Sequence, residues 1–375
     1  MTLTTFAQME MCWECLKGLN VMYATWLFFS VITLALLRAQ FKSIIALWPS
    51  WRQNTLTPTS DMTLVLLGKD AADHVKPWIE ALQSHPHTQN TPVIVVDDQS
   101  QGQTRQALDQ LIKAYPHMHA VHVPPSVRFQ DSSKLAYTLG FKACTTRYAV
   151  CVNLQFQPPE QLNQWLSTMM EPLGGRVLAS WTWSQSLGGL WLQFEHAMEH
   201  LHAARRQVNA GRATGLKASA FAIDVKSFFQ VKGFLSHMHL DGGTIEFLMN
   251  DLAKLGQVRP VLAKNMALLP RFELPMNVRV HKHRKWKERN GLKIAGILQA
   301  IHLLLWTLLI AKPLYDVGFQ GPIDRFLLIS GSLTILPLLN AYTLSMIWCA
   351  SDHSWTMGLL SPLYWIKTLL RIRRS

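Results

Sequence analysis

Long apolar segments at both ends of the chain constrain its architecture more than any other feature of the sequence. Residues 21–37 contain no charged residue and are rich in Leu, Phe, Ile and Trp. Two further apolar segments, at residues 294–311 and 326–348, lie towards the C-terminus. Since a helix needs about 17–25 predominantly apolar residues to cross a bilayer, we predict three transmembrane helices, the last two forming a hairpin.

Basic residues beside these segments predict their orientation. Arg38 and Lys42 directly follow the first segment, and residues 279–293 contain seven Lys and Arg against one Glu. Basic loops stay on the cytoplasmic side, so we expect residues 1–20 outside and the central chain in the cytoplasm. A signal peptide is the alternative for the first segment, but two Glu residues occupy its N-terminal flank and no small-residue cleavage site follows.

The C-terminal residues 355–375 mix apolar and basic side chains. This pattern is typical of an amphipathic helix that lies on the cytoplasmic surface, where its basic residues meet the lipid headgroups. A fourth, shallow span over residues 355–370 is the alternative, although its apolar part is shorter and contains Lys367.

The composition narrows the class of protein. Lys and Arg number 36 and Asp and Glu 23, so the net charge is +13, yet only 16% of residues are charged and 49% are hydrophobic. Soluble chains carry roughly 25% charged residues. The balance excludes a disordered chain and a disulfide scaffold, and fits an anionic membrane surface or anionic ligands. Nucleic acid is not an expected partner, because the basic residues cluster beside the predicted spans.

The central residues 60–290 lack the long apolar segments seen at both ends of the chain, and their pattern predicts an α/β domain. Short apolar runs alternate with helical patterns, which indicates parallel βαβ units with helices on both faces of a sheet. Ligands bind such sheets at the carboxyl ends of the strands. The expected strands are 63–67, 92–96, 119–123 and 148–152, and the expected helices are 72–84, 104–115 and 134–143.

Five short motifs follow one another within residues 61–286. They are 93–100 (VIVVDDQS), 133–143 (SKLAYTLGFKA), 148–158 (YAVCVNLQFQP), 227–240, and 284–286 (RKW). In order and spacing they resemble the motifs of membrane-bound family 2 glycosyltransferases with a GT-A fold, and are most similar to the type common in Bacteroidetes. The resemblance implies a Rossmann-like cytoplasmic domain on the bacterial inner membrane. The family transfers a sugar from a nucleotide sugar to a lipid or glycan acceptor.

The motif that binds metal in the family is altered in this chain. The family's D-x-D ligates Mn²⁺ or Mg²⁺, which neutralises charge on the leaving diphosphate. The aligned residues here are Asn153 and Gln155. Amide oxygens bind a hard cation far more weakly than carboxylates do. We therefore expect no metal cofactor and an impaired transferase.

The family's catalytic acidic motif aligns with residues 243–250, where only Glu246 keeps a carboxylate. Glu246 could deprotonate an acceptor hydroxyl, with Asp241 as a nearby substitute, or it could be a solvated helix residue. Two hypotheses stay open. One is a pseudoenzyme that binds a nucleotide, a glycan or a partner enzyme of glycan assembly, and the other is an active, metal-independent glycosyltransferase that uses Glu246 as its base.

The resemblance assigns Asp97 and Asp98 to the base and ribose of the nucleotide. The alternative is a turn after a strand, which Asp also favours. Lys69 takes the place of the family's Arg at the end of the first strand, and the resemblance assigns it to the nucleotide site as well. Lys134 could reach a phosphate or lie on a solvated helix face.

The last motif and one aromatic run complete the candidates. Lys282, Lys285 and Trp286 fall on the family's phosphate-facing Q-x-x-R-W motif. A Lys there offers a phosphate a point charge, whereas an Arg would offer the forked hydrogen-bond donors of a guanidinium.

Residues 181–202 are rich in Trp and His. We interpret this run as an amphipathic helix at the membrane lipids that guides a lipid acceptor. The alternative is a metal pair of His196 and His200, spaced one helical turn apart.

Overall fold

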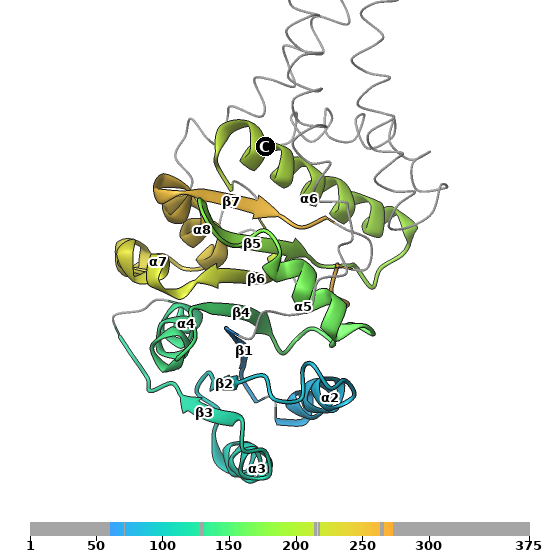
Figure 1. Ribbon diagram of the computed structural model, residues 1–375, viewed down its shortest axis with the longest axis vertical. Coiled ribbons are helices and arrows are strands. Elements are labelled where there is room, and N and C mark those ends of the chain that lie inside the picture. The colour runs from blue at the N-terminus through green and yellow to red at the C-terminus, as the bar shows by residue number, and fades with distance from the viewer. Residues whose placement is uncertain are drawn as a thin grey trace, which may run out of the picture. The chain divides into compact units, whose positions relative to one another are not determined.

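The computed structural model describes residues 61–70, 72–127, 131–213, 216, 218–262 and 266–272. These residues form a seven-stranded mixed sheet with helices on both faces (Figure 1). The segments 1–20, 21–37, 294–311, 326–348 and 355–375 lie outside the described residues. Among the helices that are described, none has the length and apolar character that a membrane crossing requires.

The first half of the sheet is Rossmann-like and confirms the expected α/β class. Its four strands are parallel and lie in the order β3-β2-β1-β4. The strands are β1 (Met62–Gly68), β2 (Val93–Asp97), β3 (Met118–His122) and β4 (Tyr148–Asn153), and the helices between them are α2 (Ala72–Gln83), α3 (Gly102–Lys113) and α4 (Ser132–Ala143). Every strand and helix expected up to residue 152 is present, within two residues at either end. The chain reverses its direction of travel across the sheet between β1 and β4, so the crevice that binds ligands in such sheets lies at their carboxyl ends.

The second half of the sheet is mixed. Strand β6 lies antiparallel between β4 and β5, and β7 pairs parallel with β5. The elements are α5 (Leu162–Met170), β5 (Val177–Trp183), α6 (Leu190–Ala210), β6 (Ala218–Asp224), α7 (Val225–Gln230), the 3₁₀ turn η2 (Leu235–His237), α8 (Thr244–Leu255) and β7 (Gln257–Pro260).

This half corrects the interpretation of residues 181–202 as one helix. Trp181 and Trp183 belong to β5 and are buried, and the helix α6 begins only at Leu190. Side chains two residues apart on a strand lie on the same face of the sheet. Because both faces of this sheet are covered, two Trp side chains on β5 are explained by packing in the core. The membrane role predicted for the aromatic run therefore has no support from its first residues.

The helices divide between the two faces of the sheet. Helices α2, α3 and α5 pack with one core cluster, while α4, α7 and α8 cover the opposite face (Figure 1). Gly140 lets α4 approach the sheet closely, because a Cβ there would lie 2.9 Å from Val96 Cγ2 and 3.1 Å from Val65 Cγ1. The glycine of the SKLAYTLGFKA motif thus has a packing role. The start of α4 lies at the carboxyl edge of the sheet, because the Ser132 hydroxyl donates to Asp98, which follows β2.

Candidate functional site

The predicted nucleotide and metal motifs meet at one edge of the sheet. Asp97, the last residue of β2, lies opposite Gly68 of β1 and His122 of β3. Asn153, the last residue of β4, lies opposite Leu67 on the other side of β1. Parallel strands end at the same edge, so these four strand ends define one candidate site.

Asp97 is a buried residue with structural partners, since its side chain is only 3% exposed. Its Oδ1 accepts the backbone N–H of Ser100 at 3.2 Å, and its Oδ2 lies 2.8 Å from His122 Nδ1. The other ring nitrogen of His122 lies 2.9 Å from Asp109 Oδ1. These contacts support the turn role that was the alternative for Asp97. Its nucleotide role stays a prediction.

Asp98 differs from its neighbour because one of its oxygens is unpaired. Its Oδ2 accepts the Ser132 hydroxyl at 2.8 Å, whereas Oδ1 is buried without a hydrogen-bond partner in the part of the chain that the structure describes. Burial raises the pKa of the Asp98 carboxyl; the Ser132 hydrogen bond opposes this shift, and the charge of Asp131 adds to it. Lys69, which is exposed, lies close enough to lower that pKa. A buried acceptor without a donor is a candidate contact for a ligand hydroxyl.

Asp131 links the start of α4 to the start of α8. It caps α4, because its Oδ1 accepts the backbone N–H of Ser133 at 3.0 Å. Its Oδ2 accepts the hydroxyl of Thr244, the first residue of α8, at 2.7 Å. Glu246 lies in the first turn of α8 and is 4% exposed. The suggestion that Glu246 is a solvated helix residue is therefore wrong, and its role as a base stays a prediction.

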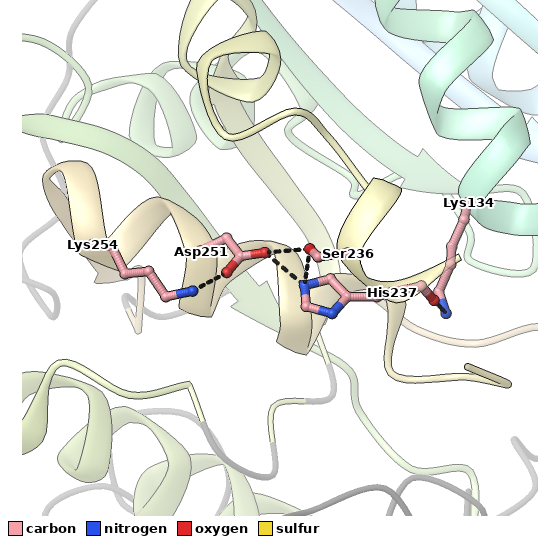
Figure 2. A network of polar contacts seen from close by, with 5 residues as sticks. All are labelled: Lys134, Ser236, His237, Asp251 and Lys254. Carbon is pink, nitrogen blue, oxygen red and sulfur yellow. Dashed lines mark hydrogen bonds and ion pairs between the residues drawn. The ribbon is translucent and has the colours of Figure 1, made fainter. Parts of the chain in front are cut away.

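Lys134 is fully buried, so its interpretation as a solvated residue is also wrong. Its Nζ donates to the backbone carbonyl of His237 at 2.9 Å (Figure 2) and to that of Leu240 at 2.5 Å. Burial lowers the pKa of Lys134, while the charges of Asp131 and Asp241 act in the opposite direction. The two hydrogen bonds of Lys134 thus link the segment between α7 and α8 to α4, and Asp241 lies near them. Contact of Lys134 with a phosphate stays a prediction.

The far side of the same segment is held by a polar network (Figure 2). His237 Nε2 lies 2.6 Å from Asp251 Oδ2, and the Ser236 hydroxyl donates to the same oxygen at 3.3 Å. Lys254 pairs with the other oxygen of Asp251. Burial would raise the pKa of Asp251, but the hydrogen bonds from His237 and Lys254 outweigh it and hold that pKa below its ordinary value. Residues 236–240 are therefore anchored to both α4 and α8.

The altered metal motif, Asn153 to Gln155, forms a turn held by a hydrogen bond to the Asn153 side chain. Asn153 Oδ1 accepts the backbone N–H of Gln155 at 3.0 Å. The carbonyl of Gln155 accepts the backbone N–H of Arg271 at 2.7 Å. Within the described ranges, no three or more His, Cys, Asp or Glu side chains gather as a metal site would require. His200, of the suggested metal pair, is buried and its ring centroid lies 5.7 Å from that of Trp183.

Several residues of this edge were absent from the sequence predictions. Asp131 and Ser132 had a signal, because Asp-Ser-Ser before an apolar helix is a helix-start pattern. Thr244, His122 and Arg271 had none, because their partners lie far away in the sequence. Lys282, Lys285 and Trp286 lie outside the described residues, and their assignment stays a prediction.

Comparisons with known proteins concern the fold. No protein-family model matches the chain, and no curated protein sequence matches it. Among solved structures, the chain is similar to the mannosyltransferase PcManGT from Pyrobaculum calidifontis in complex with GDP-Man and Mn²⁺, with 14% identity, a TM-score of 0.45, and 92% of this chain and 94% of that chain covered. It is also similar to glucosyl-3-phosphoglycerate synthase from Mycobacterium tuberculosis in complex with Mn²⁺, UDP and glucosyl-3-phosphoglycerate, with 12% identity, a TM-score of 0.42, and 60% of this chain and 79% of that chain covered.

These structural neighbours are GT-A-type glycosyltransferases with a mixed sheet. With TM-scores below 0.5, the likenesses carry no conclusion about the activity of this chain.

Proposed function

We propose that this chain binds a nucleotide sugar at the carboxyl edge of β1, β2 and β4, and that its transferase activity is impaired or lost. The observation that carries the proposal is the chain of hydrogen bonds that connects this edge. Asp98 contacts Ser132 at the start of α4, and the adjacent Asp131 contacts Thr244 at the start of α8. Three motifs of the family 2 glycosyltransferase pattern thereby converge on the place where α/β sheets bind ligands.

The donor atoms of the altered motif support binding without a metal. Asn153 and Gln155 offer neutral amides, and Asn153 Oδ1 already accepts a backbone hydrogen bond. Neutral amide groups are poor ligands for Mg²⁺ or Mn²⁺, which prefer carboxylate and water oxygens. We therefore include metal independence in the proposal.

The burial of Glu246 supports impaired transfer. A general base must come within hydrogen-bond reach of the acceptor hydroxyl, and a side chain 4% exposed offers little surface for that contact. The second candidate function is metal-independent transfer with Glu246 as base. It is favoured by one observation, the Asp131–Thr244 hydrogen bond that brings the first turn of α8 to the site.

The cellular setting of the proposal comes from the apolar segments. Residues 21–37, 294–311 and 326–348 would hold the domain on the cytoplasmic face of a bacterial inner membrane. A lipid or glycan acceptor, or a partner enzyme of glycan assembly, would then meet the domain at the membrane surface. Membrane lipids would contact the basic residues 355–375.

Calorimetric titration of the purified full chain tests nucleotide binding. We expect UDP-Glc or GDP-Man to bind in the presence of EDTA, and manganese to change the affinity by less than about tenfold, or ~1.4 kcal/mol. Asp98→Asn should weaken binding at least about tenfold, because it alters the unpaired acceptor. Asp61→Asn is the matched control, since Asp61 is exposed and precedes β1 at the opposite edge. Binding that requires manganese, or that survives Asp98→Asn, would contradict the proposal.

A transfer assay with membranes as acceptor separates the two candidate functions. We expect no robust transfer by the wild-type chain, and none after Asn153→Asp and Gln155→Asp together. One well-placed electrostatic group is typically worth about 10²–10³ in rate, and groups that act as a unit do not recover singly. Sugar transfer by the wild-type chain that Glu246→Gln abolishes would establish the active enzyme instead.

A further inference from the structure

Arg271 carries buried hydrogen-bond donors that the fold does not use. Its Nε and Nη2 are buried, and neither has a hydrogen-bond partner among the described residues. A guanidinium keeps its charge in proteins and presents five N–H donors in a fixed fork. Leaving donors of a charged group buried and unpaired costs free energy. Such a group calls for a specific explanation.

The backbone places Arg271 at the altered metal motif. Its N–H donates to the carbonyl of Gln155, and a bridge between Phe156 and Pro270 holds the two segments together. Gln155 follows Asn153, the last residue of β4, by two positions. Arg271 therefore lies beside the turn where the family resemblance expects the second carboxylate of D-x-D.

The surroundings of Arg271 also reach the end of β1. His74, in the first turn of α2, follows the carboxyl end of that strand. Burial lowers the pKa of the His74 imidazole, and the nearby charge of Arg271 lowers it further. The Arg271 side chain thus lies near elements that follow both β1 and β4, the two strands beside the crevice. Because Nε and Nη2 of Arg271 have no hydrogen-bond acceptor among the described residues, an anion is the counterpart that would complete this site.

We propose that Arg271 binds the diphosphate of the nucleotide and supplies there the positive charge that a metal ion supplies in relatives. The inference rests on the proposed function and names the group that recognises the phosphates. A guanidinium fork pairs with two phosphate oxygens through parallel charge-assisted hydrogen bonds. The exchange of carboxylates for amides at residues 153 and 155 is consistent with it, because carboxylates beside Arg271 would pair with the guanidinium and neutralise it.

The test uses the full chain in EDTA and compares inorganic pyrophosphate, UDP, GDP, uridine and guanosine by calorimetry. We expect the wild-type chain to bind pyrophosphate and one diphosphate. Arg271→Gln should weaken both at least tenfold and leave nucleoside binding unchanged, with Arg271→Lys intermediate. Arg259→Gln is the matched control, because Arg259 lies exposed on β7. Thermal unfolding of Arg271→Gln should occur no lower than that of the wild type, whereas a purely structural arginine would lower it.

The outcomes separate the inference from the proposed function. Diphosphate binding that is unchanged in Arg271→Gln overturns the inference and leaves the proposed function standing. Pyrophosphate binding that depends on Arg271, without binding of any nucleotide, would establish an anion site at Arg271 but overturn both the proposed function and the assignment of that anion to a nucleotide diphosphate. Binding of neither pyrophosphate nor a nucleotide in EDTA overturns both.

Discussion

Replacing Lys134 by Met is expected to lower the free energy of unfolding by about 3 kcal/mol. The Nζ of Lys134 donates to the carbonyls of His237 and Leu240, and the side chain is fully buried. Hydrogen bonds from charged groups are worth about 1.5–3 kcal/mol each, and the carbonyls left behind lose their donor. Methionine fills most of the volume but donates nothing. Denaturant unfolding followed by circular dichroism measures the change.

Lys142→Met is the matched control for this prediction. Lys142 lies in the last turn of the same helix and is exposed, so its replacement should change stability by less than about 0.5 kcal/mol. Hydrogen exchange should also show faster opening of residues 236–240 in Lys134→Met alone. A loss below 1 kcal/mol would mean that the segment is held mainly by the His237–Asp251 contact.

The neighbours Asp97 and Asp98 are expected to respond in opposite directions to substitution. Asp97→Ala should cost about 2–3 kcal/mol, because a buried acceptor is removed from both His122 and the Ser100 N–H. Asp109→Ala is its control, since Asp109 contacts the same histidine from a side chain 41% exposed and should cost at most about 1 kcal/mol. Both changes are read from denaturant unfolding at pH 7.

Asp98→Asn should raise stability at neutral pH and reduce its dependence on pH. The pKa of Asp98 is raised above its ordinary value of 3.8, so the folded state holds the proton more tightly than the unfolded state. Its contribution to stability is therefore complete below pH 3.8 and is lost as pH rises through the folded-state pKa. At pH 7 the ionised carboxylate opposes folding, and the amide removes that opposition. A lower free energy of unfolding in Asp98→Asn, or an unchanged one in Asp97→Ala, would contradict the structural role assigned to Asp97 and the ligand role assigned to Asp98.

The first half of the fold was predictable because its signals are local. Apolar runs of five or so residues that alternate with helical periodicity define β1 to β4 and α2 to α4 within each segment. The same local signals placed Asp97, Asp98 and Asn153 at strand ends, and hence at one edge of the sheet. Strand β5 was missed because Trp181 and Trp183 look like a membrane-facing aromatic run in the sequence. Only the fold shows that β6 and α6 bury them.

The sequence by itself determined the α/β class, the carboxyl edge as the candidate site and the presence of amides at Asn153 and Gln155, where the family resemblance predicts carboxylates, since residue type and order suffice for these. Tertiary structure alone decided that Asp97 is held by His122, that Lys134 and Glu246 are buried, and that Arg271 lies beside Gln155. Each of these facts depends on a contact between segments distant in the chain. Burial and pairing set the charge and availability of a side chain, and a linear pattern contains neither.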